Sequence, residues 1–365
     1  SSAVLFFTSS LFAFATIIAY PVVSNLRQSL QKILLIQTAL LTFLACRDLM
    51  PILFIWVVIN IPSYVHAIKS PSKESRNIAL LHLASSLSFA VFSFLYIQHN
   101  STSVINLEYM KKAGEVVYIP VFFAFALLLR QGLFPFHFWV MLRERKLKSF
   151  MTGLSSLILS CTYLPMMLER ESSLSMILLI VLLISVYYFT VLSFTASSSR
   201  HLLAYLFLAQ GALLSALSLL HAEQELLGTA ILTLMLCFGG LLLIVLIIEE
   251  RIGSIKLNTF NGLYKVFPFA SGCFLVLVLS LLAFPGTIGY SSFEEILHFS
   301  FHHSNLIGFA ILIPLTLHAI LLFKFFSRIF LGDTGADLPW FPITISEKIA
   351  LLVIVTPVLL HHFVL

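Results

Sequence analysis

The chain has 365 residues, of which 59% are apolar and only 10% are Asp, Glu, Lys or Arg, and its formal net charge is +5. Soluble domains are about 45–50% apolar and about 25% charged, because a globule must present many polar residues to water. The composition therefore excludes a soluble enzyme, a nucleic-acid-binding domain and a disordered chain, and it indicates a polytopic membrane protein.

The apolar runs are continuous and long, as in Met176–Thr195 and Leu232–Ile248. About 20 residues cross a hydrocarbon core as a helix, whereas the strands of a membrane barrel would alternate apolar and polar residues. We therefore expect an all-α transmembrane helix bundle forming one domain over 1–365. About twelve or thirteen spans are predicted, at roughly 2–24, 30–46, 49–67, 77–97, 116–142, 150–168, 174–196, 201–220, 226–249, 266–284, 286–300, 305–330 and 345–365.

The N-terminal stretch Ala3–Val23 has no basic segment before it, so we interpret it as a first span and not as a removable signal. Most basic residues lie in odd-numbered loops, which places these loops on the cytoplasmic side or its organellar equivalent and the N-terminus on the other side. The cysteines have no CxxC spacing and are expected to be small buried side chains, not ligands or disulfides: Cys46, Cys161, Cys237 and Cys273.

Two apolar runs are interrupted by Gly and Pro and also hold ionisable groups. The first interruption contains Gly132 and Pro135, and the second contains Pro285, Gly286 and Gly289. Backbone groups freed at membrane depth must be satisfied by protein or by water in a cavity. A pair of broken helices in the two halves of a chain is typical of a transport path, although proline kinks without function are also common in membrane helices.

Several ionisable or polar residues lie within predicted spans, where a charge costs about 3 kcal/mol or more. Each has two interpretations. Arg130 is a fixed cation in a polar axis or a side chain that reaches the interface, and His137 is a proton relay or part of an interfacial aromatic belt. Glu294 and Lys324 are members of a proton path or groups near water. His82 and Gln210 are relay members or simply polar residues that face the bundle.

Two histidine pairs, His302-His303 and His361-His362, lie near predicted helix ends. We interpret both as interfacial and not as metal sites, because no acidic or cysteine partner lies at ligand spacing. The sequence has no phosphate-binding loop, nucleophile elbow or haem motif. We therefore expect no catalytic centre, cofactor or metal in this chain.

Four segments resemble the family of NADH dehydrogenase subunit 2. Leu129–Trp139 resembles the interrupted helix in which a Lys precedes a Pro-Phe-His-x-Trp element, and Ser199–Tyr205 resembles a Lys-Arg-x-Leu-Ala-Tyr-Ser helix start. Pro285–Ser292 resembles a Pro-Pro-x-x-Gly-Phe-x-Ser-Lys break, and Ile313–Phe330 resembles the penultimate span. The segments occur in the family's order over about the last two thirds of the chain.

The resemblance implies an antiporter-like membrane subunit of respiratory complex I, the proton-translocating NADH:ubiquinone oxidoreductase. Such a subunit has inverted five-helix repeats, two broken helices and a buried chain of Lys, Glu and His residues that carries protons. Its partners would be other membrane-arm and accessory subunits and lipids. NADH, FMN, iron–sulfur clusters and quinone would be bound by partner subunits. The short N-terminal part resembles mitochondrial versions, which implies the mitochondrial inner membrane.

The chain departs from the family's pattern along the charged axis. Arg130 stands in place of a Lys and cannot serve as a proton relay, because Arg does not deprotonate in proteins. Four further family Lys or Glu positions fall on uncharged residues: Val57, Ala79, Ser160 and Phe293. Three functions are considered, namely a complex I subunit that conducts or scaffolds proton translocation, a cation/proton antiporter, and a purely structural subunit. The depletion argues against the antiporter, because cation/proton exchange would require the buried Lys and Glu residues.

Overall fold

The computed structural model is mostly helical in the part of the chain that it describes. This part comprises residues 10, 38, 42, 49–69, 73–100, 118–137, 157–158, 160–162, 164–165, 173–333 and 343–364. Within these residues the only extended pairing is an isolated bridge between Ser198 and Lys256. The prediction of an all-α chain is thereby confirmed, whereas the predicted spans 2–24 and 30–46 and most of 150–168 lie outside the described residues.

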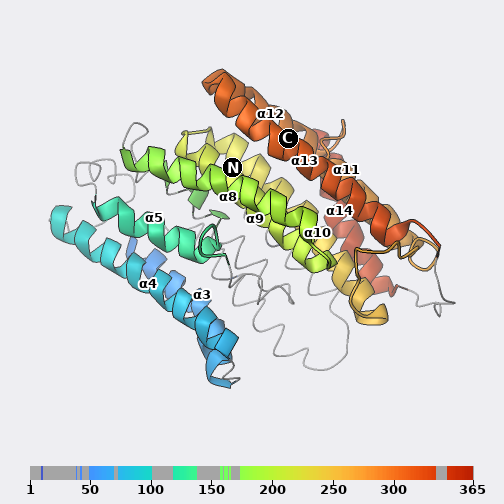
Figure 1. The fold of residues 1–365 in the computed structure, drawn as a ribbon, viewed down its shortest axis with the longest axis horizontal. Helices are drawn as coiled ribbons and strands as arrows, with labels where there is room; N and C mark the ends of the chain where they lie inside the picture. The colour runs from blue at the N-terminus through green and yellow to red at the C-terminus, as the bar shows by residue number, and fades with distance from the viewer. Residues whose placement is uncertain are drawn as a thin grey trace. The chain divides into compact units, whose positions relative to one another are not determined.

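The described residues contain ten helices, which Figure 1 labels. Their bounds are α3 (Leu49–Lys69), α4 (Lys73–Asn100), α5 (Tyr118–Gln131), α8 (Ser173–Thr195), α9 (Ser199–Leu219), α10 (Gln224–Ile252), α11 (Pro268–Leu281), α12 (Ile288–His303), α13 (Asn305–Phe330) and α14 (Ile345–Val364).

Five helical segments in the described part of the chain are long and apolar enough to cross a membrane. They are Arg76–Tyr96 within α4, and α8, α9, α10 and α13; Val121–Gln131 and Pro268–Leu281 are shorter apolar helices. These lengths and compositions fit a polytopic transmembrane bundle. The two short segments are the helices that end at the predicted interruptions, which explains why neither reaches spanning length.

The chain forms two compact units, which are described separately. Unit 1 comprises residues 1–30, 186–210 and 225–365, and unit 2 comprises residues 31–185 and 211–224. The division therefore falls within α8 and within α9.

In unit 2, α4 packs against both α3 and α5, which appear in blue to green in Figure 1. The interface is aromatic: Trp56 of α3 stacks on Phe89 of α4 with ring centroids 4.5 Å apart, and Phe92 lies 5.1 Å from Phe123 of α5. Rings at these separations contribute packing energy beyond their buried area. This aromatic core positions the end of α5, where the first interruption begins.

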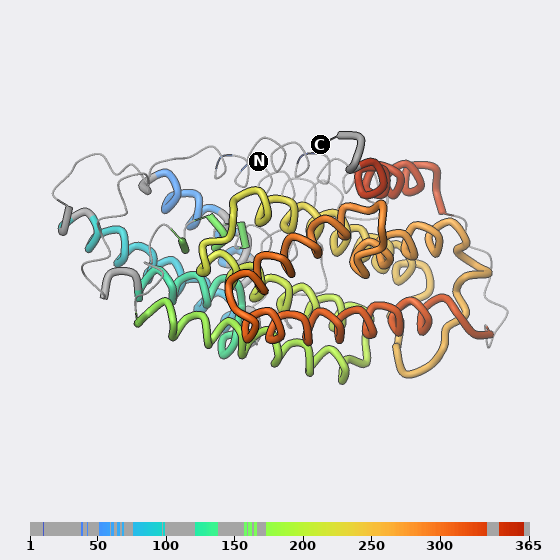
Figure 2. The backbone as a smooth tube through the Cα atoms, turned by 90° about the horizontal axis from the view of Figure 1, so that it is seen from above, coloured from blue at the N-terminus to red at the C-terminus, as the bar shows by residue number. Residues whose placement is uncertain are grey.

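In unit 1, α12 packs against α13, and α11 contacts α12, α13 and α14. The tube in Figure 2 follows this part of the chain in orange and red. α10 is the most enclosed of the five spanning segments, with 94% of its most hydropathic window buried. α10 is therefore an interior helix, whereas the other spanning segments leave more of their surface uncovered.

Candidate functional site: two helix breaks and their buried polar groups

Arg130 is completely buried at the end of α5, with 0% of its surface exposed. Its guanidinium carbon lies 4.4 Å from the ring centroid of Trp56, and Nη1 donates a hydrogen bond to the Trp56 carbonyl at 3.3 Å. An aromatic face and a carbonyl oxygen both stabilise a desolvated cation. The structure therefore places the guanidinium of Arg130 inside unit 2, where it is held by Trp56 and does not reach the surface of the chain.

The helix ends immediately after Arg130 in a turn closed by Gly132. Gly132 has φ +71°, and the amides of Gly132 and Leu133 both donate to the Leu128 carbonyl, at 3.1 and 3.2 Å. Glycine adopts this left-handed conformation without strain, which is why it commonly terminates helices. The following Phe134–Pro135 peptide bond is cis. The interruption predicted from Gly132 and Pro135 is thus a true helix end.

Gln131, beside Arg130, joins three helical segments of unit 2. Its Nε2 donates to Ser215 Oγ at 3.0 Å, and its Oε1 accepts from Ser160 Oγ at 3.2 Å and from Ser215 Oγ at 3.3 Å. A buried amide requires such partners. Ser160, where the family resemblance placed a lost lysine, therefore lies inside the bundle and supports the break through its hydroxyl.

His82 lies on α4 and is 1% exposed, so it faces the bundle, as one interpretation of the sequence held. One turn later Ser86 accepts a hydrogen bond from Asn60 Nδ2 at 3.0 Å, and Asn60 is also fully buried. Val57, in contrast, is 40% exposed. Val57 therefore faces away from the interior of this unit, contrary to the expectation that it marks a lost charge inside the bundle, and Asn60 is a buried polar residue of the same helix.

His137 lies after the first break, where it is partly exposed and stacks against Phe134 with ring centroids 6.5 Å apart. Arg130, His82 and His137 thus all belong to unit 2. The interpretation of His137 as a relay residue remains a prediction.

The second break separates α11 from α12 and includes Pro285 and Gly286. Gly286 has φ +88°, and Ala283, a non-glycine residue, also adopts the left-handed region at φ 57°. After the break, the backbone of Gly289 lies directly against Ser280, whose Oγ accepts from Gly289 N at 3.2 Å. A Cβ at position 289 would lie 1.7 Å from the Ser280 carbonyl oxygen. The second predicted interruption is therefore also a true break, and it depends on the missing side chain of Gly289.

Unit 1 contains a buried histidine between two polar partners. His318 on α13 is 2% exposed; its Nε2 lies 2.7 Å from Thr190 Oγ1 on α8, and its Nδ1 lies 3.0 Å from Gln210 Nε2 on α9. Thr190 Oγ1 donates its single proton to the Val186 carbonyl. It must therefore accept from Nε2–H of His318, which leaves Nδ1 to accept from the Gln210 amide. The arrangement fits a neutral imidazole with its proton on Nε2.

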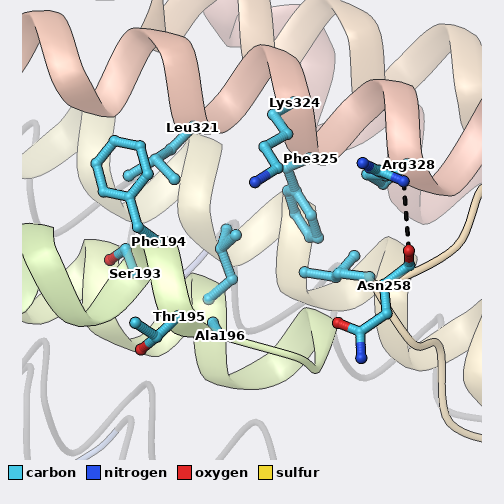
Figure 3. Close-up of a pocket in the computed structure, with 11 residues that line it drawn as sticks. Ser193, Phe194, Thr195, Ala196, Asn258, Leu321, Lys324, Phe325 and Arg328 are labelled. Carbon is cyan, nitrogen blue, oxygen red and sulfur yellow. Dashed lines mark hydrogen bonds between the residues drawn. The ribbon is translucent and has the colours of Figure 1, made fainter.

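Lys324 lies on α13, six residues after His318, and is exposed to a cavity of about 380 Å³ (Figure 3). Arg328 lies one turn further along the same cavity. Glu294 is exposed on α12 and lines a different pocket, whereas its neighbour Glu295 accepts from Thr229 of α10 at 3.1 Å. Within the described residues, no hydrogen bond or ion pair joins Glu294 to Lys324, so the predicted proton-path candidates of unit 1 do not form one connected network.

Two ionic clusters lie at the C-terminal end of α10. Glu249 is 5% exposed and accepts from Ser199 Oγ at 2.6 Å, from Ile255 N at 3.1 Å and from Arg200 Nε. Arg251 donates to Glu347 of α14 at 2.6 Å. Buried carboxylates are tolerated where several donors surround them. These contacts fix the ends of α9, α10 and α14 relative to one another within unit 1.

The sequence did not identify Glu249, Glu347, Thr190 or His318 as site residues. A signal exists for Glu249, because it directly follows a long apolar run, where a carboxylate requires a partner. Thr190 has no such signal, since hydroxyl side chains are common in membrane helices. None of the described residues forms a group of three or more His, Cys, Asp or Glu that could hold a metal.

Residues 46–318 match the family model described as NADH:quinone oxidoreductase/Mrp antiporter, transmembrane. The structure is similar to a chain of the membrane-bound sulfane sulfur reductase, an archaeal respiratory membrane complex, with a TM-score of 0.85 at 14% identity. That similarity covers 98% of this chain but only 64% of the other, so the chain spans less than two thirds of this relative's length. A chain of the Mrp complex from Dietzia sp. DQ12-45-1b gives a TM-score of 0.78 at 16% identity, over 99% of this chain and 79% of that one. No curated protein matches the sequence.

Proposed function

Because this chain belongs to the NADH:quinone oxidoreductase/Mrp antiporter family of transmembrane subunits, we propose that it is a proton-conducting membrane-arm subunit of a proton-translocating NADH:ubiquinone oxidoreductase. Within that enzyme it corresponds to the subunit 2 type, as a single multi-pass domain in the mitochondrial inner membrane. It binds no redox cofactor itself, and NADH, FMN, iron–sulfur clusters and quinone belong to its partner subunits.

The buried network around His318 is the observation that carries the proposal. The imidazole lies inside unit 1 with a hydroxyl on one ring nitrogen and a carboxamide on the other. An imidazole can take up a proton on its unprotonated ring nitrogen and release it again. A carboxamide can present either its NH₂ or its carbonyl oxygen to the same neighbour. The site can therefore hold His318 in either protonation state without leaving a ring nitrogen unpaired.

The proposed proton step follows from this geometry. In the neutral state the Gln210 NH₂ donates to Nδ1 of His318. When a proton arrives, it binds Nδ1, and a half-turn of the Gln210 amide presents Oε1 to the new N–H. Nε2 continues to donate to Thr190 throughout. Release of the proton from Nδ1 and a second half-turn of the amide restore the first arrangement, so two half-turns accompany each passage.

The other predicted residues receive supporting roles in this proposal. Arg130 remains charged and acts as a fixed electrostatic element in unit 2. His82 and His137 are the exchangeable groups of that unit, and Glu294 and Lys324 are the groups near the surface of unit 1 where protons enter or leave. Gly132, Pro135, Pro285, Gly286 and Gly289 form the two breaks at which backbone polar groups become available.

A subunit of a cation/proton antiporter complex is the second candidate, and the similarity to a chain of the Mrp complex favours it. A purely structural subunit is the third candidate; it predicts that neutral substitutions of the polar residues change nothing except assembly. The energy source separates the first two, because proton movement in the first is driven by NADH oxidation and in the second by a cation gradient.

The test replaces His318 by Gln in the assembled complex reconstituted into liposomes, with proton uptake and NADH oxidation measured together. Loss of a positioned proton-transfer group slows its step by roughly 10²–10⁴-fold. We therefore expect fewer protons pumped per electron while NADH oxidation continues. The matched control is His302→Gln, because His302 is exposed at the end of α12.

A second variant distinguishes a loss of proton transfer from a folding defect caused by the substitution of His318. Gln210→Leu keeps His318 but removes the partner of Nδ1, and it should lower pumping in the same direction. An unchanged proton-to-electron ratio in both variants, in complexes that assemble fully, would contradict the proposal and support the structural role. Proton movement that follows an imposed sodium gradient without NADH would instead identify an antiporter.

A further inference from the structure

A basic cavity lies between α8 and α13, at the C-terminal ends of both helices (Figure 3). It measures about 380 Å³, and the side chains of Lys324 and Arg328 reach it from α13. The residues that line it also include Phe194 and Thr195 of α8, Phe325 of α13 and Asn258 of the segment after α10. All of these residues belong to unit 1.

The cavity contains two cationic side chains and no carboxylate among the residues that line it. Within the described residues, Lys324 makes no ion pair. Arg328 stacks on Phe260, with its guanidinium carbon 4.3 Å from the ring centroid, and Nη1 donates to the Asn258 carbonyl at 3.4 Å. A guanidinium has five N–H donors, so this contact orients Arg328 and still leaves donors for a ligand. A cavity of this charge selects an anion.

The position of the cavity along the helices points to a particular source of that anion. Arg328 lies in the last turn of α13, and the nearby bridge between Ser198 and Lys256 lies in the segments that follow α8 and α10. Basic residues collect where spanning helices reach the headgroups of the membrane. Lys324 and Arg328 are four residues apart, which places their side chains on neighbouring positions of one helix face. Two such cations can bind one phosphate group together.

Exposed apolar side chains lie near the cavity on both helices. Phe194 and Val191 on α8 are 42% and 63% exposed, and Ile320 and Phe323 on α13 are 55% and 58% exposed. A free phosphate ion would gain nothing from this surface, whereas the acyl chain of a lipid would cover it. Charge and apolar surface together therefore match an amphiphile with an anionic headgroup.

We propose that this cavity binds the phosphate of an anionic phospholipid, with Lys324 and Arg328 on the headgroup and the exposed faces of α8 and α13 along the acyl chains. The proposal does not rest on the network around His318. Lys324 is also one of the surface groups in the proposed proton path, so lipid retention is measured separately from proton pumping.

The test uses the purified complex in two kinds of nanodisc, one of phosphatidylcholine alone and one with added phosphatidylglycerol, with lipid retention measured by native mass spectrometry. We expect phosphatidylglycerol to be retained preferentially. Each basic residue near an anionic lipid contributes about fivefold to binding, so the double variant Lys324→Gln, Arg328→Gln should retain it about 30-fold more weakly. The double variant Lys256→Gln, Lys265→Gln is the charge-matched control, because both lysines are exposed and line no part of this cavity.

Three results would overturn the proposal. The first is equal retention of phosphatidylglycerol by both double variants. The second is binding of inorganic phosphate in place of phosphatidylglycerol, with phosphate occupying the site as well as the lipid does. This result would identify a site for a free anion. The third is a cross-link from position 324 to an acidic side chain of another subunit, which would identify a protein contact.

Discussion

At the scale of single residues, Glu249 shows how a carboxylate is held within an apolar bundle. Three donors surround it, namely Ser199 Oγ, the guanidinium of Arg200 and the Ile255 amide. These donors come from the start of α9 and the loop after α10, so one side chain fixes the junction between two helices. Hydrogen bonds to charged groups contribute about 1.5–3 kcal/mol each when they are buried.

Replacing Glu249 with Gln tests this role. Gln offers one acceptor oxygen where Glu offers two, and its NH₂ group would face the donors of Arg200. We expect the free energy of unfolding to fall by about 1.5–3 kcal/mol, measured as a lower thermal midpoint of the purified complex. Glu250→Gln is the control, because Glu250 is the exposed neighbour. Equal midpoints for the two variants would show that the Glu249 contacts contribute nothing.

The residue scale also shows what could be predicted from the sequence. Arg130 and His82 were identified as groups at membrane depth, and both are buried. The partners of Arg130 could not be foreseen, because Trp56 lies 74 positions earlier and only the packing of α3 on α4 and α5 brings it close. The polar contacts of His318 could not be predicted for the same reason, since its partners lie on two other helices.

At the scale of secondary-structure elements, the break between α11 and α12 depends on the close contact of Gly289 with Ser280. The predicted spans 266–284 and 286–300 correspond to α11 over Pro268–Leu281 and α12 over Ile288–His303. Proline and glycine in an apolar run predicted this interruption well. The contact itself could not be predicted, because nothing local in the sequence reveals how closely two backbones approach after a turn.

Gly289→Ala should disrupt the break. The new Cβ would lie 1.7 Å from the Ser280 carbonyl oxygen, and backbone cannot move aside as a flexible side chain can. Overpacking of this kind costs about 1–3 kcal/mol or more, so we expect less assembled complex on native gels. The control is Gly272→Ala in α11, where a Cβ would meet nothing within 4 Å. Normal assembly of Gly289→Ala would show that the two backbones can separate at no cost.

At the scale of the whole molecule, the composition correctly predicted a membrane protein. It could not predict which helices pack against each other. An apolar fraction of 59% indicated a membrane bundle, and the helices bear this out. Which helices pack together could not be inferred, because lipid tails are as apolar as leucine and hydrophobicity alone gives a spanning helix no preferred neighbour. The division of the chain into units 1 and 2 within α8 and α9 likewise has no signature in the hydropathy pattern.

The cysteines provide a test of burial across the molecule. Cys161, Cys237 and Cys273 are 2%, 0% and 8% exposed, as predicted for small buried side chains, whereas Cys46 lies outside the described residues. Thiols react only when they are accessible. In a Cys46→Ser background, we expect a bulky maleimide to label the protein only after denaturation, with labelling read by mass spectrometry. Rapid labelling of the native protein would show that the bundle is open where the structure has it closed.

The enclosure of α10 has a consequence for biogenesis. Its mean hydropathy over the best window is 3.0, the highest of the five spanning segments, yet 94% of that window is buried. A segment inserts during synthesis according to its hydropathy, before its neighbours are in place. Gly240 then permits close approach, since a Cβ there would lie 2.6 Å from Leu277 of α11 and 3.0 Å from Ile354 of α14. The high hydropathy of α10 thus favours its insertion into the bilayer, and close packing against α11 and α14 then buries it away from lipid.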